Sequence, residues 1–234
     1  KHKTAQSIGI QSVQVELPAT ATQTEVEDRV RQLAADKNVH GILVQMPLPS
    51  HLDTEAVLRL IPAEKDVDGL TEASMGRLMR DVPGHVGCTP LGVLRLLQHY
   101  GIATSGKHVV VIGRSTLVGL PLSVLLARKG IDATVTLAHS RTTHLEELCR
   151  SADIVVSATG IAHSITAAHI APGATCIDVG ISRTKAGIVG DIDADSVMGI
   201  AGALTPMPGG TGIMTVACLM ENTINASVMQ GVQV

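Results

Sequence analysis

Short runs of aliphatic residues alternate along the chain with segments in which apolar residues recur every three or four positions. Several runs have no polar alternation, which is typical of parallel strands covered on both faces. The runs predict strands at Ser12–Glu16, Gly41–Gln45, His108–Ile112, Ala133–Leu137, Ile154–Ser157 and Thr175–Val179. The helical pattern predicts Thr24–Asp36, Thr54–Leu60, Gly92–Tyr100, Val118–Lys129, Thr143–Arg150 and a last helix at Met214–Val228. This alternation indicates an α/β fold with a parallel sheet.

Proline and glycine are concentrated in two places along the chain. The stretch Pro62–Pro90 carries many loop signals, and a second loop, Thr205–Gly212, precedes the last predicted helix. We therefore expect one domain over residues 1–90 and another over residues 91–205. The final segment, 206–234, is expected to pack back on one of them, with the first favoured.

Composition excludes several classes of protein. The chain has 234 residues, 45% of them hydrophobic, and a formal net charge of −3, with no Trp, no Phe and one Tyr. Scarce aromatic residues argue against a single-stranded nucleic-acid platform, and the negative charge argues against a binder of phosphate backbones. No apolar run approaches the roughly 18 residues of a membrane-spanning helix. We expect neither a nucleic-acid nor a membrane partner.

The metal-ligating residues are scattered. The cysteines are far apart, and the ten histidines form no His-Glu-x-x-His pattern, so we predict no metal site. Scattered cysteines in a core-rich chain fit a reducing compartment, and we expect a cytoplasmic location. An organelle stays an alternative, because the chain begins at Lys1 rather than Met and a targeting segment could precede it.

The clearest site signal is an aliphatic strand that runs into a glycine turn and then a helix. Gly113 and Gly119 bracket the turn, and Ser115 stands where the usual dinucleotide fingerprint has its second glycine. This order points backbone N–H groups and the positive end of a helix at a phosphate. Taken alone, the motif is also compatible with an ordinary strand–turn–helix corner.

The segment after the next predicted strand indicates which dinucleotide binds. An NAD site usually places Asp or Glu there against the ribose 2′-hydroxyl, but this sequence reads Ala138-His-Ser-Arg141. A carboxylate would repel a 2′-phosphate, whereas Arg114, Ser140 and Arg141 could pair with one. The hypothesis is therefore NADP rather than NAD.

Two further strand ends place small residues where backbone can approach a cofactor closely. One is Ser157–Gly160 and the other is Asp178–Ile181. Each could be an ordinary turn, but as a series they extend the predicted cofactor site to Thr159, Gly160, Gly180 and Ile181.

The first domain offers two weaker signals. Gln45 ends an apolar strand and is followed by a Pro-x-Pro exit, which would turn its amide toward a cleft. Asp66 and Asp68 would share one face if their segment is extended. Read alone, the second motif is better explained as an acidic turn in solvent, and neither motif names a reaction.

Together these segments resemble the bifunctional methylenetetrahydrofolate dehydrogenase/methenyltetrahydrofolate cyclohydrolase family. The matching segments occur in the family's order and span nearly the whole chain: Gly41–Pro49, Lys65–Gly69, Cys88–Pro90, Val110–Ser115, Ile177–Gly180 and Pro206–Gly210. The resemblance implies an N-terminal α/β catalytic domain that binds folate, a Rossmann-like NADP-binding domain with a parallel sheet, and a cleft between them.

The same resemblance implies the chemistry. The substrates would be tetrahydrofolate derivatives, and the cofactor would be NADP. 5,10-Methylenetetrahydrofolate would be oxidised to the 5,10-methenyl form and then hydrolysed to 10-formyltetrahydrofolate in one-carbon metabolism, by a homodimer. A truncated or degenerate member that binds NADP or folate without turnover is the alternative. Another two-domain NADP oxidoreductase is disfavoured by the Gln45 and Asp68 motifs.

Roles for single residues also follow from the resemblance. Lys1 would be the catalytic lysine, with its tyrosine partner expected upstream of this sequence, on a segment that also supplies a strand and a helix. Gln45 would orient Lys1, and Asp68 would accept hydrogen bonds from the pterin N–H groups. The folate pocket would be lined by Val44, Met46, Pro208, Gly209, Gly210, Thr211 and Gly212.

Three positions depart from the family's pattern. Gly87 stands where the family has proline, which is expected to loosen the segment between the domains. Thr211 and Ile213 replace valine and proline in the Gly-Gly-Val-Gly-Pro-Met-Thr loop. Loss of a proline removes rigidity and restores an N–H donor, so folate binding is expected to be either weakened or repacked.

Overall fold

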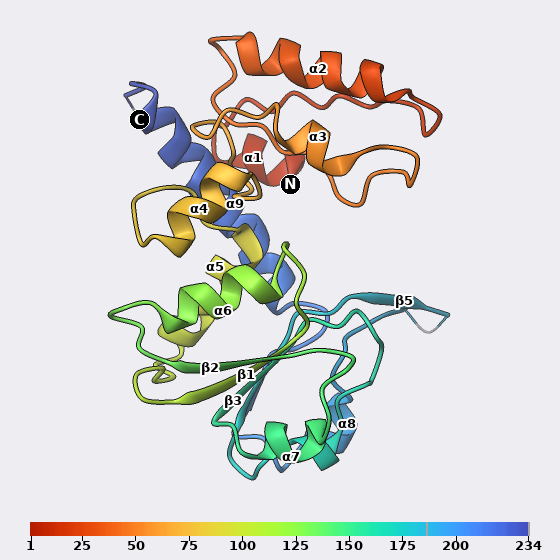
Figure 1. The fold of residues 1–234 in the computed structure, drawn as a ribbon, viewed down its shortest axis with the longest axis vertical. Helices are drawn as coiled ribbons and strands as arrows, with labels where there is room; N and C mark the ends of the chain where they lie inside the picture. Colours follow the sequence, from red (N-terminus) through yellow and green to blue (C-terminus); the bar gives the residue numbers. More distant parts are fainter. Residues whose placement is uncertain (186, 234) are drawn as a thin grey trace. The chain divides into compact units, whose positions relative to one another are not determined.

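The computed structural model describes residues 1–185 and 187–233, which form two compact units (Figure 1). Unit 1 comprises Lys1–Cys88 and Val216–Val234, and unit 2 comprises Thr89–Thr215. The first boundary lies close to the predicted one at Pro90, but the second lies later than the predicted Thr205. Residues 206–215 stay with unit 2, where the Thr211 hydroxyl donates a hydrogen bond to the backbone oxygen of Asp178.

Unit 2 is built on a five-stranded parallel sheet in the order β2-β1-β3-β4-β7. Its strands are β1 (His108–Ile112), β2 (Thr134–Ala138), β3 (Ile154–Ser157), β4 (Thr175–Asp178) and β7 (Ala203–Leu204). The strand order reverses between β1 and β3, which pair in parallel. In open α/β sheets, ligands bind outside the carboxyl ends of the strands at such a reversal.

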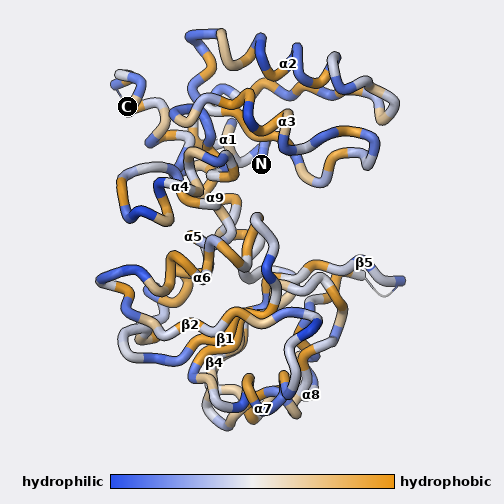
Figure 2. Tube along the Cα trace, viewed as in Figure 1, coloured by the Kyte–Doolittle hydropathy of each residue, from blue (hydrophilic) through white to orange (hydrophobic). Residues whose placement is uncertain are grey.

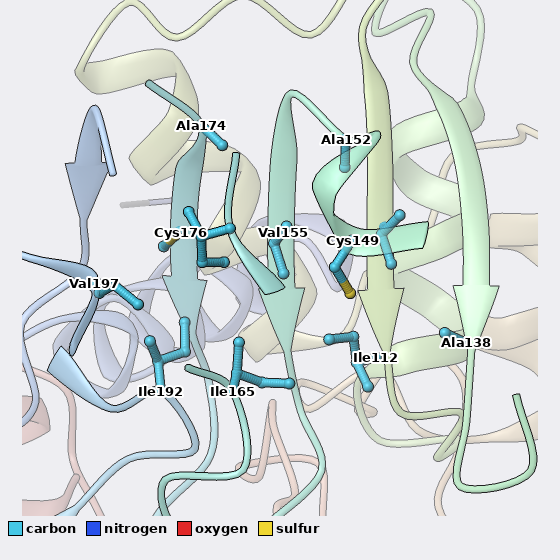
Figure 3. Packing of buried hydrophobic residues seen from close by; sticks show 12 residues of the cluster. Ile112, Ala138, Cys149, Ala152, Val155, Ile165, Ala174, Cys176, Ile192 and Val197 are labelled. Carbon is cyan, nitrogen blue, oxygen red and sulfur yellow. The ribbon is translucent and has the colours of Figure 1, made fainter. Parts of the chain in front are cut away.

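The central strands consist of continuous aliphatic runs because both faces of the sheet are covered. Val109, Val110 and Val111 of β1 are fully buried, as is Val155 of β3. Figure 2 shows β1 and β4 in the hydrophobic colour, and Figure 3 shows part of the core on one side of the sheet, where Ile112, Val155 and Cys176 pack with their neighbours. The predicted parallel sheet is confirmed.

Helices and a hairpin complete unit 2. These elements are α5 (Cys88–His99), α6 (Gly119–Ala127), α7 (Leu145–Arg150), the 3-10 helix η1 (Ala167–His169), the antiparallel pair β5 (Ser182–Thr184) and β6 (Gly187–Val189), and α8 (Ala194–Val197). The last helix, α9 (Thr211–Met229), belongs to unit 2 up to Thr215 and to unit 1 from Val216 onward.

Unit 1 contains α1 (His2–Ser7), α2 (Gln23–Ala35), α3 (Thr54–Leu58) and α4 (Glu72–Met79). Its core includes Val26 and Val30 of α2, packed with Ile42 and Val57. The helix α2 begins at a capping box, in which Thr22 and Glu25 satisfy each other's backbone N–H groups.

Three sequence-based expectations for unit 1 are wrong. Ser12–Glu16 and Gly41–Gln45 are not strands: in the described part of the chain they form no ladder, and the second makes only an isolated bridge between Ile42 and Asp66. A strand needs a partner along its length, and the described residues supply none to either run. The predicted loop Pro62–Pro90 contains α4, because the Thr71 hydroxyl caps the helix at the Ser74 N–H.

The four cysteines are all buried, and they form no disulfide among the described residues. None of the helices within the described ranges is long and apolar enough to cross a membrane.

Candidate functional site

Lys1 and Gln45 contact each other in unit 1. Lys1 Nζ donates a hydrogen bond to Gln45 Oε1 at 2.9 Å. The Gln45 amide nitrogen in turn donates to the backbone oxygen of Met46 at 2.9 Å. Because the amide N–H₂ group is bonded on that side, the oxygen is held toward the lysine.

Asp68 lies close enough to Lys1 for the two charges to interact. Its side chain is partly buried, and burial raises the pKa of the carboxyl, while the adjacent Cys88 side chain and the positive charge of Lys1 lower it. The structure thus brings together the three residues predicted to be catalytic. We call Lys1, Gln45 and Asp68 the lysine cluster.

Two buried side chains hold the backbone next to Asp68. The Cys88 thiol donates to the backbone oxygen of Val67 at 3.3 Å, and Asn222 Nδ2 donates to the same oxygen at 2.9 Å. Burial raises the pKa of Cys88, so the sulfur keeps its proton and acts as a donor. Sequence reasoning missed Asn222. Its neighbours Glu221 and Thr223 are also polar, so no local pattern marked it.

Asp66 does not share a face with Asp68, so that expectation is wrong. The segment is not extended, because the Gly69 N–H donates to the Asp66 backbone oxygen and closes a turn. The Asp66 carboxylate is buried and accepts hydrogen bonds from the Thr71 N–H at 2.8 Å and the Thr71 hydroxyl at 2.7 Å. Asp66 therefore fixes the turn that presents Asp68.

Val44 and Met46 flank Gln45 and are partly buried against the apolar core of unit 1. The apolar contacts of these neighbours hold the backbone on both sides of the Gln45 amide. Their contact with folate stays a prediction.

The glycine turn after β1 has the close approaches that only glycine permits. Gly113 has a φ of +119°, and a Cβ there would overlap the backbone oxygen of Ala158. A Cβ on Gly119 would overlap the backbone oxygen of Gly113. Ser115 has a structural role, since its hydroxyl accepts the Val118 N–H at 3.2 Å. The predicted fingerprint is thus a tight turn in which serine replaces a glycine.

The start of α6 is suited to an anion. Its N-cap residue, Val118, makes no side-chain cap. Arg114 lies in the preceding turn, and Ser140 and Arg141 follow β2; all three are exposed. A dinucleotide with a 2′-phosphate fits this donor set, because the side chains offer only guanidinium and hydroxyl groups.

The turns after β3 and β4 hold the remaining predicted cofactor residues. The N–H groups of Thr159 and Gly160 donate to one carboxylate oxygen of Asp191, at 2.6 and 3.2 Å. Gly180 is buried, and its N–H donates to Asp178 Oδ1 at 3.1 Å. Ile181 is 58% exposed, so its apolar side chain is free to cover a flat ring.

The loop before α9 belongs to unit 2 and is closely packed. Gly209 has a φ of +110°, and a Cβ on Gly210 would lie 2.6 Å from the Pro206 backbone oxygen. The Thr211 hydroxyl is buried and donates to the Asp178 backbone oxygen at 2.9 Å. Thr211, which stands where the family's pattern has valine, therefore adds a hydrogen bond that holds the loop. The exposed Pro208 and Gly212 stay predicted folate contacts.

Two profiles of one protein family match this chain. The profile for the tetrahydrofolate dehydrogenase/cyclohydrolase catalytic domain matches residues 1–68, and that for the family's NAD(P)-binding domain matches residues 87–231. The chain belongs to the tetrahydrofolate dehydrogenase/cyclohydrolase family. The first match contains the lysine cluster, and the second contains the glycine turn after β1.

Individual members of the tetrahydrofolate dehydrogenase/cyclohydrolase family are closely similar. The bifunctional protein FolD of Sphingopyxis alaskensis is 51% identical over 234 residues, covering 97% of this chain and 77% of that protein. A 5,10-methylenetetrahydrofolate dehydrogenase structure from the silkworm Bombyx mori is 41% identical, with a TM-score of 0.94, covering 98% of this chain and 82% of that one.

A third relative was solved with a cofactor. The methylenetetrahydrofolate dehydrogenase-cyclohydrolase (FolD) of Trypanosoma brucei, complexed with NADP and an inhibitor, is 39% identical, with a TM-score of 0.92. The match covers 97% of this chain and 80% of that one. The family resemblance inferred from the sequence is confirmed.

Proposed function

We propose that this chain is an NADP-dependent methylenetetrahydrofolate dehydrogenase and methenyltetrahydrofolate cyclohydrolase. It oxidises 5,10-methylenetetrahydrofolate to the 5,10-methenyl form and hydrolyses that product to 10-formyltetrahydrofolate. The observation that carries the proposal is the hydrogen bond from Lys1 Nζ to Gln45 Oε1, made beside Asp68. Bifunctional FolD relatives at about half identity support it.

The lysine cluster would bind the folate and move a proton. The Asp68 carboxylate accepts paired hydrogen bonds from pterin N–H groups. In the hydrolysis, water adds to the methenyl carbon and one of its protons passes to Lys1 Nζ. The carbon–nitrogen bond then breaks, the released nitrogen takes that proton back from Nζ, and the second proton of the water leaves to solvent as the formyl carbonyl forms. Gln45 directs Nζ through a neutral acceptor, which adds no charge that would hold the ammonium protonated.

Unit 2 would hold the cofactor. NADP, when bound, accepts the hydride that the methylene bridge loses. Gly113 and Gly119 keep side chains away from the turn, and Arg114 and Arg141 pair with the 2′-phosphate. The hydroxyls of Ser115 and Ser140 and the turns at Thr159–Gly160 and Gly180–Ile181 complete the cofactor's surroundings.

Near-ultraviolet absorbance tests the proposal, because both reduced cofactor and methenyl product absorb there. The wild-type chain is expected to form both from methylenetetrahydrofolate and NADP. Lys1→Met should slow hydrolysis of the methenyl substrate by about 10²–10⁴-fold, the usual contribution of a general acid–base group, with NADP affinity unchanged. Lys3→Met, an exposed neighbour, is the matched control.

The absorbance measurements also separate the alternatives. A wild-type chain that binds NADP and folate without forming product would favour a degenerate member of the family. Rapid hydrolysis by Lys1→Met would contradict the role of the lysine.

We propose further that the protein is a homodimer in the cytoplasm. The dimer rests on the family resemblance, and four buried cysteines with no disulfide among the described residues fit a reducing compartment. Sedimentation should give twice the chain mass. A monomer mass at every concentration, or recovery in an organelle fraction, would contradict these two points.

A further inference from the structure

Two buried carboxylates interlock in unit 2 beside the proposed cofactor turns. Asp178 ends β4 and is 2% exposed, and Asp191 precedes α8 and is 0% exposed. A Cβ on Gly180 would overlap the Asp191 carboxylate, and a Cβ on Gly190 would overlap the Asp178 carboxylate. Each aspartate thus occupies the space that a glycine leaves on the other's segment.

Asp191 holds the turn after β3. Its Oδ2 accepts hydrogen bonds from the Ser157 hydroxyl at 3.0 Å, the Thr159 N–H at 2.6 Å and the Gly160 N–H at 3.2 Å. Hydrogen bonds to an ionised acceptor are about twice as strong as neutral ones. One carboxylate oxygen therefore sets the direction of two successive peptide groups in this turn.

Asp178 extends the same arrangement to the turn after β4. Its Oδ1 accepts the N–H groups of Gly180 at 3.1 Å and Asp191 at 3.0 Å, and its Oδ2 accepts that of Ile192 at 2.9 Å. Asp178 thus holds both the Gly180 turn and the backbone of Asp191. Burial raises the pKa of Asp178, and the nearby Asp191 charge raises it further, against the three backbone N–H groups that lower it.

The second oxygen of Asp191 is unusual. Oδ1 is inaccessible to solvent and has no hydrogen-bond partner among the described residues. A buried oxygen without a partner is unfavourable, and a site that keeps one calls for an explanation. The explanation is that the side chain is oriented by Oδ2, which bonds to Thr159 and Gly160, and both of these residues belong to the proposed cofactor site.

We propose that Asp191 is a positioning residue for NADP. Through Oδ2 it holds the Thr159–Gly160 turn, and together with Asp178 it holds the Gly180–Ile181 turn, in the conformation that admits the cofactor. This inference rests on the proposed function, because the cofactor is the one proposed there. The carboxylate of Asp191 has no direct part in the reaction.

The near-isosteric variant Asp191→Asn tests the proposal. It keeps an acceptor oxygen but removes the charge, so the Kd for NADP should rise about tenfold, as expected from weakened charge-assisted bonds. Amide hydrogen exchange at Thr159 and Gly160 should become faster even without cofactor. Hydrolysis of the methenyl substrate is not a redox reaction and needs no NADP, so its rate should stay the same.

Two further variants make the result specific. Asp193→Asn removes a nearby carboxylate that caps α8 at the Ser196 N–H, and it should leave NADP affinity unchanged. Ser157→Ala removes one donor to Oδ2 with little change in packing. It should raise the NADP Kd by a few-fold, as expected for loss of one hydrogen bond.

The outcomes separate this inference from the proposed function. Unchanged NADP affinity in both Asp191→Asn and Ser157→Ala would overturn the inference alone. A parallel fall in NADP affinity, hydrolysis rate and melting temperature would also overturn it, because Asp191 would then serve only stability. A wild-type chain that does not bind NADP would overturn the proposed function and this inference with it.

Discussion

Asn222 Nδ2 donates a hydrogen bond of 2.9 Å to the backbone oxygen of Val67, although the two residues are 155 positions apart. The same amide donates to the backbone oxygen of Val86 at 3.0 Å. One side chain of α9 therefore joins the turn that carries Asp68 to the segment that leads into Cys88. The position of the Asp68 carboxylate depends on a residue near the other end of the chain.

Replacing Asn222 by leucine should destabilise unit 1 and weaken folate binding. Asn222→Leu keeps the branching of the side chain, but it leaves the Val67 oxygen with only the Cys88 thiol and takes the amide donor from the Val86 oxygen. A buried acceptor left unsatisfied costs about 1–3 kcal/mol, so the free energy of unfolding should fall by about 1–3 kcal/mol in urea titrations. The exposed Asn225→Leu should stay within about 0.5 kcal/mol of wild type. Equal stability of the two variants would refute this account.

Asp68 should lower the free energy of unfolding at neutral pH, although it strengthens folate binding. Burial raises its pKa above the ordinary 3.8, so the folded chain binds more protons than the unfolded chain between the two values. The free energy of unfolding therefore falls as pH rises through that window. Asp68→Asn removes this effect and should be more stable than wild type at neutral pH, with the difference shrinking as pH falls through that window and gone below pH 3.8.

Folate affinity should change in the opposite sense. Asp68→Asn loses hydrogen bonds to a charged group, each worth about 1.5–3 kcal/mol, so folate affinity should fall by about 10–100-fold. Asp66→Asn is not a neutral control, because Asp66 closes the turn at Thr71. A stability profile of Asp68→Asn that is parallel to wild type at all pH values would contradict the assigned cause.

Much of unit 2 can be predicted from sequence because local pattern and tertiary role agree there. The run Ile154–Ser157 is apolar and bounded by polar residues, and β3 has the predicted bounds. In unit 1 the pattern of Gly41–Gln45 is equally apolar, yet it forms only one bridge, at Ile42. The hydrophobic pattern indicates which residues are buried. A strand also requires a neighbouring strand to pair with, and the pattern does not show whether one is present.

The residues of the candidate site also differ in how well the sequence predicts them. Gly113 and Gly119 follow from a local turn pattern, which short-range sterics explain. The meeting of Lys1 with Gln45 could be expected only from the family resemblance, because no local rule joins residues 44 positions apart. Asn222 and Asp191 were missed, since their importance lies in hydrogen bonds to distant backbone groups.

Gln45→Glu should slow hydrolysis. A carboxylate at this position would face Lys1 Nζ and favour its charged form, which cannot accept a proton from water. The hydrolysis rate at neutral pH should fall about tenfold, equivalent to about 1.4 kcal/mol of added stabilisation of the ammonium. The control Gln11→Glu changes an exposed residue just after α1 and should leave the rate unchanged. An unchanged rate in Gln45→Glu would argue against direct contact during the reaction.

Arg114 and Arg141 should set the preference for NADP over NAD. Either arginine replaced by alanine loses a charge-assisted contact to the 2′-phosphate, worth about 1.5–3 kcal/mol, so the Kd for NADP should rise about 10–100-fold. The Kd for NAD should hardly change, because NAD lacks that phosphate. Lys129→Ala, an exposed residue beyond the end of α6, removes the same charge as a control. Comparable wild-type affinity for the two dinucleotides would defeat the assignment.

Gly190→Ala and Gly76→Ala should have opposite effects on stability. A Cβ at position 190 would overlap the Asp178 carboxylate, which three backbone N–H groups hold in place. Overpacking of this kind typically costs about 1–3 kcal/mol, and it should also weaken NADP binding. Gly76 lies inside α4, where an alanine methyl group would meet open space, so alanine should stabilise by about 0.5–1 kcal/mol through helix propensity. Urea unfolding checks both values. If both variants were stabilised, the two carboxylates would not be interlocked as described.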